Sequence, residues 1–378
     1  MKKLRVAFCL RDMQVGGVES VLIRTLDKLL KYKNIELNLI TYANITTPIY
    51  HEYLKKHPRI KCYSLYPCKY LGTKLPHFFL WRIIIHFMRD IYRGAKRKFV
   101  MRKFRDIDVF IDYHDFGFFD ELQYIDSAKK IVWFHSSINT FINREFVKYL
   151  GCYDKLVVLT DDFKNEFQEL YPKYANKIVR IYNPIDIDQI KDKAKEKSNK
   201  IIGDYFCNVA RLTPDKDIET VLRAFDLFWQ NNKRPDIKMV FVGDGNWAKH
   251  YQSIANSLVA KNQFVFTGAM SNPFVIMKGA KANILSSYSE GMGLVLIEAM
   301  SVGTINISSN CKCGPREILM DGQAGLLFEP GNIEGLAKCM DDVYNNKVNV
   351  KRMIANANKS LKRFDADKIV KEVISLIS

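Results

Sequence analysis

Ser289-Glu290-Gly291-Met292-Gly293-Leu294-Val295-Leu296-Ile297-Glu298-Ala299-Met300 is the stretch of sequence that decides the fold. It follows an apolar run at 282–285, which has the length of a buried strand, and it continues as an apolar helical pattern. Gly291 and Gly293 let the backbone approach a ligand closely, and the N–H groups at the helix start near Leu294 and Val295 point to the same place. This order of strand, glycine turn and helix predicts a phosphate-binding turn at the end of a parallel strand.

Strand-length apolar runs alternate with amphipathic helical stretches along the whole chain. This rhythm is typical of an α/β fold with doubly wound parallel sheets. The rhythm pauses after Asn183-Pro184 in the polar segment 191–200, which we expect to bury nothing, and then restarts. The expected strands lie at residues 4–10, 37–41, 109–113, 130–134 and 155–159, and again at 205–210, 238–242, 264–266, 282–285 and 304–308.

The length of 378 residues favours two domains of ordinary size. We expect two tandem Rossmann-like domains, residues 1–183 and 184–363, facing a central cleft at the carboxyl ends of their sheets. Eight scattered cysteines indicate reduced thiols and no structural metal. The apolar part of the N-terminus is too short for a signal peptide, and no window is apolar enough to span a membrane. The expected location is therefore the cytoplasm.

The net charge of +17 is concentrated in the N-terminal half, and residues 69–105 contain eleven Lys and Arg against one acidic residue, Asp90. An apolar block at 78–88 lies within this basic stretch. The segment could lie at the surface of an anionic membrane, on the inner face of the cell membrane. It could equally be a buried helix whose flanking cations face water. Nucleic acid is not an expected partner, because the aromatic residues form one block instead of spaced stacking platforms.

Two further features of the sequence suggest a nucleotide ligand. Glu298 is the one charged side chain of its apolar helix, so its carboxylate needs a partner. Ribose hydroxyls could donate hydrogen bonds to it, and an ion pair with a buried Arg is the alternative. Arg211 and Lys216 lie on the expected strand-to-helix loop 209–217, where they could neutralise charge on a departing diphosphate. Glu290, on the turn before the helix, would then face a transferred sugar.

The spacing of Glu290 and Glu298 resembles the Glu-x7-Glu signature of glycosyltransferase family 4, the retaining enzymes of the GT-B fold. The resemblance continues through 303–304, 314–318 and 325–328. It implies that Arg211 and Lys216 contact the donor phosphates, that 1–183 binds the acceptor and 184–363 the nucleotide sugar, and that 364–378 is a helix returning to the first domain. The sequence departs from the family at Met292, Asp217 and Ile305, where aromatic, glycine and proline residues are frequent.

Weaker matches complete the predicted site. Gly243 and Gly268 follow strands in loops that the family places beside the nucleotide, and plain turns would explain them equally well. Gly16-Gly17 opens the first helix, after the first strand. His135 ends the strand at 130–134, and its family counterpart contacts the donor sugar. The full predicted set is Gly16, Gly17, His135, Arg211, Lys216, Gly243, Gly268, Glu290, Gly291, Met292, Gly293, Leu294, Val295 and Glu298.

The resemblance implies a hexosyltransferase that moves a hexose or N-acetylhexosamine from a UDP-sugar to a hydroxyl of a cell-surface glycan, such as capsule or lipopolysaccharide, or of its lipid-linked precursor. No cofactor or metal is expected, because Asp106-Ile107-Asp108 precedes a strand instead of following one, and the family uses cationic side chains and helix ends instead. Two alternatives are an epimerase acting on UDP-sugars and a non-catalytic membrane-associated subunit that keeps the fold.

Overall fold

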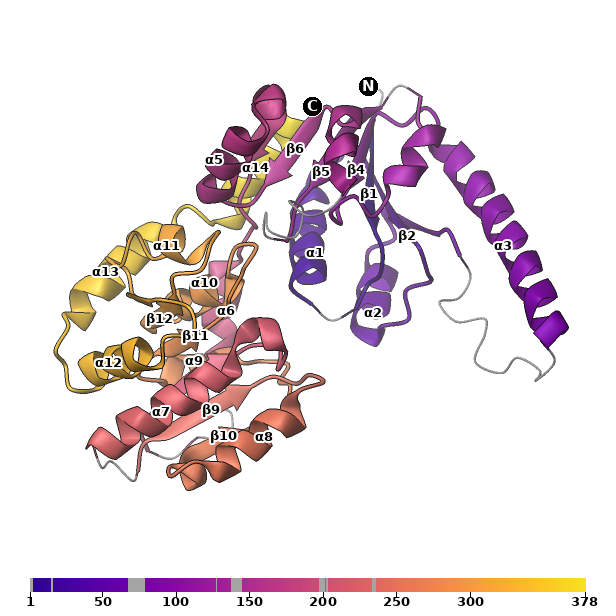
Figure 1. The fold of residues 1–378 in the computed structure, drawn as a ribbon. Coiled ribbons are helices and arrows are strands. Elements are labelled where there is room, and N and C mark those ends of the chain that lie inside the picture. The colour runs from indigo at the N-terminus through magenta and orange to yellow at the C-terminus, as the bar shows by residue number, and fades with distance from the viewer. Residues whose placement is uncertain are drawn as a thin grey trace. The chain divides into compact units, whose positions relative to one another are not determined.

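The computed structural model describes residues 3–14, 16–66, 79–126, 128–136, 145–196, 201, 203–232 and 236–378. Its internal contacts divide the chain into two units. Unit 1 contains Met1–Val158, Phe167–Ile181 and Val370–Ser378, and unit 2 contains Leu159–Glu166 and Tyr182–Ile369. Each unit is built around one parallel sheet, and both sheets can be followed in Figure 1.

Unit 1 is built on a seven-stranded sheet in the described part of the chain, with the strand order β3-β2-β1-β4-β5-β6-β7. All neighbouring strands pair in parallel. The central strands are almost completely buried, as expected when helices cover both faces of a parallel sheet. The strands are β1 (Leu4–Leu10), β2 (Ile35–Thr41), β3 (Ile60–Ser64), β4 (Val109–Asp112), β5 (Lys129–Trp133), β6 (Lys155–Val158) and β7 (Ile178–Arg180).

The helices of unit 1 connect these strands. In α1, Val21, Leu22, Leu26 and Leu29 recur at three- and four-residue spacing and are buried, so one face of the helix packs on the core. The α-helices are α1 (Gly17–Leu29), α2 (Pro48–Lys56), α3 (Phe79–Met101), α5 (Asp161–Leu170), which crosses into unit 2, and α14 (Ala366–Ile377). Short 3-10 helices are η1 (Arg102–Phe104), η2 (Phe119–Tyr124), η3 (Glu145–Cys152) and η4 (Pro172–Lys177).

Unit 2 contains a six-stranded parallel sheet in the order β10-β9-β8-β11-β12-β13. The order reverses between β8 and β11, and ligands of doubly wound sheets bind outside the carboxyl ends of strands at such a switch point. The strands are β8 (Tyr205–Val209), β9 (Lys238–Val242), β10 (Phe264–Phe266), β11 (Asn283–Leu285), β12 (Asn306–Ser309) and β13 (Leu326–Phe328).

The helices of unit 2 form two groups, as expected for the two faces of a doubly wound sheet. One group contains α7 (Ile218–Asn232), which contacts α8 (Ala248–Ser257) and α12 (Ile333–Tyr344). The other contains α10 (Leu294–Ser301), which contacts α6 (Ile187–Lys193), α9 (Phe274–Gly279), α11 (Pro315–Ile318) and α13 (Val350–Leu361). Two short 3-10 helices, η5 (Pro214–Lys216) and η6 (Lys261–Gln263), complete the unit.

The predicted fold class is confirmed: the chain has two doubly wound parallel sheets with helices between the strands. Every strand expected from the sequence is present within a residue or two of its predicted position. The structure adds β3, β7 and β13, which pair with the sheet edges.

One expectation about the polar segment 191–200 is wrong. Its first residues end α6, and Ala194 is buried together with Ile190. These two residues are four apart and share one face of the helix, while the lysines between them lie on the other side. Residues 197–200 lie outside the described residues.

The basic stretch 69–105 falls only partly within the described residues, because 69–78 lie outside them. From Phe79 to Met101 the stretch is one helix, α3, which is much longer than the apolar block that the sequence singled out. Among the described residues, no helix combines the length and apolar composition needed to cross a membrane.

Candidate functional site

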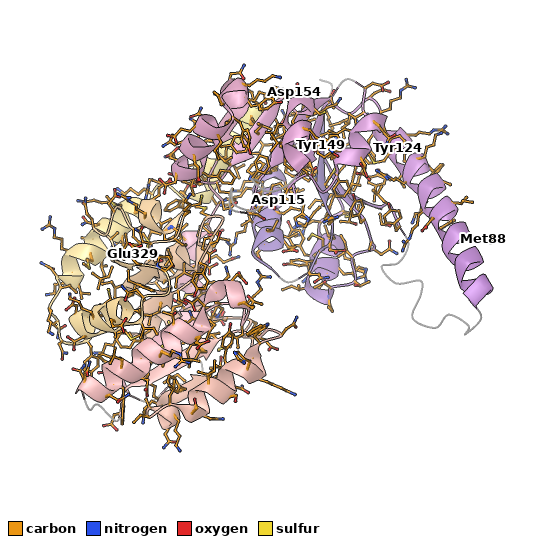
Figure 2. All side chains as sticks on the ribbon, in the orientation of Figure 1. Met88, Asp115, Tyr124, Tyr149, Asp154 and Glu329 are labelled. Carbon is orange, nitrogen blue, oxygen red and sulfur yellow. The ribbon has the colours of Figure 1, made fainter. Side chains whose placement is uncertain are left out.

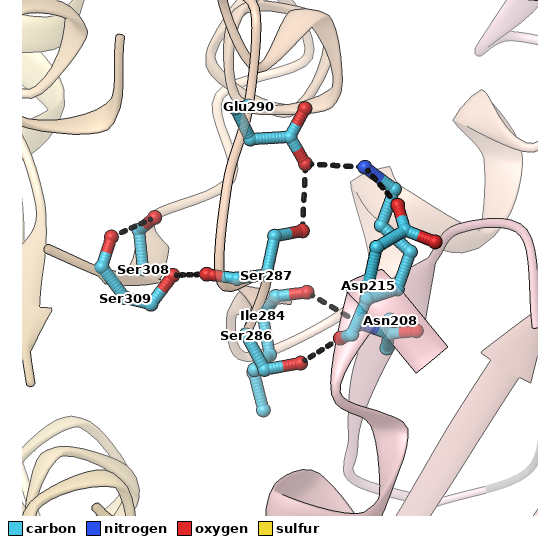
Figure 3. A network of polar contacts seen from close by, with 9 residues as sticks. Asn208, Asp215, Ile284, Ser286, Ser287, Glu290, Ser308 and Ser309 are labelled. Atoms are coloured by element: carbon cyan, nitrogen blue, oxygen red, sulfur yellow. Dashed lines mark hydrogen bonds and ion pairs between the residues drawn. The ribbon is translucent and has the colours of Figure 1, made fainter. Parts of the chain in front are cut away.

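The loops at the carboxyl ends of β8, β9, β11 and β12 meet in unit 2. The loop after β8 contains η5, and the N–H of Tyr288, after β11, donates to the carbonyl of Asp215. Ser309, at the end of β12, donates its hydroxyl to the carbonyl of Ser287, 2.7 Å away (Figure 3). The loops that the sequence singled out separately therefore form one connected surface at the switch point of the sheet.

Lys216 and Glu290 form the centre of this surface. The Lys216 ammonium lies 2.8 Å from Glu290 Oε1, and both side chains are only about 15% exposed. Ser287 donates its hydroxyl to the same carboxylate oxygen at 2.6 Å (Figure 3). Ser286 fixes the backbone of the lysine by donating to the Lys216 carbonyl at 2.7 Å. A charged pair this far from solvent is held in one geometry by its neighbours.

The charges around Lys216 keep it protonated. Burial alone would lower its pKa, but Glu290 and Asp215, whose Oδ2 lies 3.3 Å from Nζ, raise the pKa of Lys216 above its usual value. Burial would likewise raise the pKa of Asp215, yet that pKa lies below its usual value because Thr213, Lys216 and Arg211 stabilise the carboxylate. The site therefore contains a permanent cation with two carboxylates beside it.

Arg211 provides the second predicted cation. It lies directly after β8, and its side chain is exposed. None of the hydrogen bonds or ion pairs found in the described part of the chain involves its guanidinium, although its charge contributes to the stabilisation of Asp215. Arg211 is thus available to an anion in solution, whereas Lys216 is already paired.

Glycines shape the backbone of the site at two positions. Gly243 has φ +147°, and a Cβ there would overlap the carbonyl oxygen of Ala210, so the loop after β9 fits against the loop after β8 only with glycine. Gly293 is the N-cap of α10 with φ +87° and ψ +53°, a left-handed conformation that starts the helix. Gly268 accepts a hydrogen bond from the N–H of Gly243 through its carbonyl at 2.9 Å.

The remaining predicted residues of unit 2 lie on the turn and helix that follow Glu290. Met292 and Gly293 are buried, while Gly291, Leu294, Val295 and Glu298 are half-buried. The first turn of α10 leaves backbone N–H groups without intrahelical acceptors, beside the Glu290 turn. Unit 2 therefore brings Lys216 and Glu290 together, with Arg211 on the same loop as Lys216, and Glu298 lies further along α10.

The predicted residues of unit 1 lie at the carboxyl ends of β1 and β5. Gly16 is the extended N-cap of α1, and Gly17 is its first residue. His135 follows β5; its backbone N–H donates to Asp115 Oδ1 at 2.7 Å, and its ring lies 4.5 Å from that of Tyr113. Its Nε2 is buried and has no hydrogen-bond partner among the described residues. Burial and the nearby His114 lower the pKa of His135 to about 3, so the ring is neutral.

Sequence reasoning missed residues that hold these groups in place. Asp115 accepts from the Ser136 hydroxyl at 2.7 Å as well as from His135, and it has φ +51°. Ser286 and Ser287 lie before the quoted stretch and were not singled out. A polar residue directly after a predicted central strand is the signal that could have found all three.

Glu317, in the matched segment 314–318, has a supporting role. Its Oε2 accepts from the N–H groups of Asp161 and Asp162, at 2.8 and 3.3 Å, where α5 begins, and its Oε1 accepts from the Tyr182 hydroxyl. Burial raises the pKa of Glu317 above its usual value. This carboxylate fixes the start of α5 within unit 2.

Among the residues that the structure describes, no three His, Cys, Asp or Glu side chains gather as a metal site would require. Asp108 precedes β4, and its Oδ2 accepts from the N–H of Arg5 at 2.8 Å, which is a structural contact.

Most of unit 2 is similar to a known protein family. Residues 186–360 match the family model of the glycosyl transferases group 1. An uncharacterised glycosyltransferase of Methanocaldococcus jannaschii is 27% identical over 272 residues, which make up 63% of this chain and 66% of the relative. In Campylobacter jejuni, an N-acetylgalactosaminyltransferase acting on a diphospho-undecaprenol-linked sugar is 23% identical over 263 residues, covering 66% of this chain and 67% of that protein.

Solved structures give the same fold over the full length. Anabaena HepE in complex with UDP superposes with a TM-score of 0.77 at 16% identity, covering 100% of this chain and 99% of that one. Staphylococcus aureus TarM, in complex with UDP, fondaparinux and α-GlcNAc-glycerol, gives a TM-score of 0.77 at 15% identity, with 100% coverage of both chains. Residues 186–360 therefore resemble the glycosyl transferases group 1, and the chain has the two-domain fold of the GT-B glycosyltransferases.

Proposed function

We propose that this protein is a retaining glycosyltransferase that moves a hexose or N-acetylhexosamine from a UDP-sugar to a hydroxyl of a lipid-linked or cell-surface glycan. The observation that carries the proposal is the Lys216–Glu290 pair, at 2.8 Å, placed beside an exposed arginine and a helix start in a domain that resembles the glycosyl transferases group 1. The UDP complexes of structures with the same fold support the choice of nucleotide.

The charges of the site favour a diphosphate. Lys216, Asp215 and Glu290 together carry one negative charge, so the trio alone would not attract an anion. The additional positive charge comes from Arg211 and from the N–H groups at the start of α10. As the bond to the sugar breaks, charge builds on the departing diphosphate, and fixed positive groups stabilise that transition state without reorganising. No metal is needed for this step in the proposal.

Each predicted residue takes one role in the proposal. Arg211 and Lys216 bind the phosphates, and Glu298 binds the ribose hydroxyls. Glu290 accepts hydrogen bonds from the sugar, with its geometry fixed by Lys216 and Ser287. The backbone from Gly291 to Val295 approaches the sugar and phosphates, and Gly243 and Gly268 shape the loops at the nucleotide.

Unit 1 provides the residues that meet the acceptor and the transferred sugar in this proposal, including Gly16 and Gly17 at the start of α1. The neutral ring of His135 has a buried Nε2 that can donate to or accept from a sugar hydroxyl, depending on the tautomer. The acceptor hydroxyl attacks the anomeric carbon from the side that the diphosphate leaves, so the configuration is retained and no protein nucleophile is required.

The acceptor class follows from the relatives and from α3. Two Campylobacter jejuni relatives are named for transfer to undecaprenol diphosphate-linked sugars, and a Salmonella relative for transfer to lipopolysaccharide.

We infer that α3 contacts an anionic membrane: Met88, Ile91, Tyr92 and Phe99 are 52–65% exposed on one side of it. Figure 2 shows Met88 on the side of α3 turned away from the sheet of unit 1. Lys96 and Lys98 flank this apolar stripe, as in helices that lie at a membrane surface.

A donor screen tests the proposal. Purified protein is incubated with a panel of UDP- and GDP-sugars, with and without membrane extract as acceptor, and the released nucleotide is measured. Acceptor-dependent release from a UDP-sugar, with an α-linked product by NMR from an α-linked donor, is the expected result. Absence of release from every sugar offered contradicts the proposal. A new UDP-sugar epimer formed without acceptor would instead identify an epimerase, and biological activity that survives Glu290→Ala and Arg211→Ala would identify a non-catalytic subunit.

A further inference from the structure

Unit 1 contains a cavity that the donor site does not use. It has a volume of about 650 Å³ and lies at the carboxyl ends of the neighbouring strands β3, β2, β1 and β4, closed on one side by α3. This position is where doubly wound sheets bind ligands. Its polar lining consists of Arg11, Asp12, Tyr42, Tyr66, Asp90, Arg93, Arg97 and His114.

Three guanidinium groups converge on this cavity from two elements. Arg11 follows β1 and lies 5.9 Å over the ring of Tyr42, while Arg93 lies 5.4 Å over the ring of Tyr66. An arginine stacked on an aromatic face keeps the N–H groups at its edge available for a planar or tetrahedral oxyanion. The aromatic rings of Tyr42 and Tyr66 therefore support Arg11 and Arg93 at the lining of the cavity.

Arg97 stands one helical turn after Arg93 on the same face of α3, and it is the most strongly anchored of the three. Its Nε lies 2.8 Å from Oε1 of Glu121, which is fully buried, and its Nη2 lies 3.6 Å from Asp120. Burial raises the pKa of Glu121 and the charge of Arg97 opposes that rise, so the pair holds Arg97 at the wall of the cavity.

A neutral donor completes the lining. The Nδ1 atom of His114 is buried and has no hydrogen-bond partner in the described part of the chain. Burial lowers the pKa of His114, so the ring is uncharged and can donate one N–H. Two aspartates, Asp12 and Asp90, also line the cavity, so its lining contains three guanidinium groups against two carboxylates. This excess of positive charge favours an anion.

The two faces of α3 present different chemistry. Arg93 and Arg97 face the cavity, whereas Met88, Ile91, Tyr92 and Phe99 are exposed on the opposite side. A soluble anion would bind only to the arginines. A phosphate attached to a hydrophobic chain would benefit from both faces of α3. Its phosphate would bind to the arginines, and its chain would lie in the membrane that the apolar stripe contacts.

We propose that this cavity binds the phosphate or diphosphate group of a lipid-linked acceptor through Arg11, Arg93 and Arg97. The inference rests on the proposed function, whose acceptor it specifies. The volume exceeds what one phosphate requires, so a diphosphate and part of the attached sugar fit within it.

Titration calorimetry with farnesyl diphosphate, below its micelle concentration, tests the proposal. The double variant Arg11→Gln/Arg93→Gln is compared with Lys33→Gln/Lys55→Gln, which removes two exposed cations of unit 1 that do not line the cavity. Arg97 is left unchanged because its loss would leave the buried Glu121 without its cation. We expect at least a tenfold weaker Kd in the cavity variant and less than a twofold change in the control. Equal weakening in both variants, or none in the cavity variant, overturns the proposal.

Two further experiments are needed. One distinguishes a lipid-linked diphosphate from a free ion, and the other distinguishes the cavity from the donor site. Inorganic pyrophosphate should bind at least tenfold more weakly than farnesyl diphosphate; equal affinity at the cavity would mean that a free ion is recognised and would overturn the lipid-linked assignment. UDP binding should be unchanged in Arg11→Gln/Arg93→Gln. Loss of farnesyl diphosphate binding in Arg211→Gln instead would place the lipid phosphate at the donor site and overturn the proposal. A protein that binds farnesyl diphosphate at the cavity but consumes no UDP-sugar would contradict the proposed function alone.

Discussion

Lys216 Nζ lies 2.8 Å from Oε1 of Glu290, although the two residues are 74 positions apart in the sequence. The contact joins the loops that follow β8 and β11, the strands on either side of the switch point in unit 2. One carboxylate oxygen thus receives both the ammonium and the Ser287 hydroxyl. In the proposed function, this pair orients a glutamate for a sugar and a lysine for a diphosphate, and both side chains are only about 15% exposed.

Replacing Lys216 with methionine should abolish turnover. The variant loses one fixed cation at the departing diphosphate, which costs about 100-fold or more in rate. It also leaves Glu290 half-buried without its cation, so the melting temperature should fall. Lys249→Met, an exposed lysine of the same unit, is the control and should change neither property.

The double variant Lys216→Met/Glu290→Gln should recover thermal stability but no turnover. Recovery of turnover in the double variant would show that the lysine serves only to neutralise the glutamate.

Replacing Gly243 with alanine should unfold unit 2 at lower urea concentration. The new Cβ would overlap backbone atoms of Ala210, which cannot move without disturbing β8, so we expect a cost of about 3 kcal/mol or more. Gly268→Ala is the matched control: it also has a positive φ, +73°, but no atom lies within 4 Å of its added Cβ. Its cost should be only about 1 kcal/mol. Equal costs would mean that the close contact at Ala210 is absent in solution.

His135 should make the folded state sensitive to acid. Its pKa is about 3 in the folded protein and near its usual 6.5 when unfolded, so the unfolded chain binds the extra proton between these values. The contribution of His135 to stability is therefore complete above pH 6.5 and is lost as the pH falls towards 3, by at most about 1.4 kcal/mol per pH unit. Urea unfolding at several pH values should show a shallower loss in His135→Gln than in the unchanged protein. Parallel curves would contradict the buried, neutral state of this ring.

The apolar stripe of α3 should bind anionic vesicles. In flotation experiments with phosphatidylglycerol vesicles, Met88→Ser/Ile91→Ser/Phe99→Ser should reduce the bound fraction several-fold, because burial of these side chains drives the contact. Ile49→Ser/Leu170→Ser/Val259→Ser removes three exposed apolar side chains elsewhere and should leave binding unchanged. Binding should weaken in 0.5 M salt, which screens the flanking cations. Equal binding of both triple variants would exclude α3 as the contact.

The central part of both sheets could be predicted from the sequence because those strands are buried on both faces and are therefore continuously apolar. Val6 to Leu10 in β1 and Met239 to Val242 in β9 are examples. Of the four edge strands, β10 was predicted, whereas β3, β7 and β13 were not recognised. β3 reads Ile-Lys-Cys-Tyr-Ser with two exposed residues, and β7 and β13 have three residues each, so their pairing depends on the neighbouring strand more than on their own composition.

The candidate site was predictable as a set of residues but not as a geometry. The motifs named Lys216 and Glu290 separately, with roles towards phosphate and sugar, and their direct contact depends on loop conformation. Asp217 illustrates this: it stands where the resembled family often has glycine, and the structure gives it φ +47°, the left-handed conformation that glycine adopts without strain. The arginine cavity of unit 1 was not foreseen, because Arg11, Arg93 and Arg97 converge only in three dimensions.

The most direct test of the account compares the binding of UDP and uridine by titration calorimetry. If Arg211, Lys216 and the start of α10 hold a diphosphate, UDP should bind at least tenfold more tightly than uridine, and Arg211→Gln should remove most of that difference while leaving uridine binding unchanged. Equal affinities for UDP and uridine, or an undiminished preference for UDP in Arg211→Gln, would contradict the central claim that these groups bind the departing diphosphate.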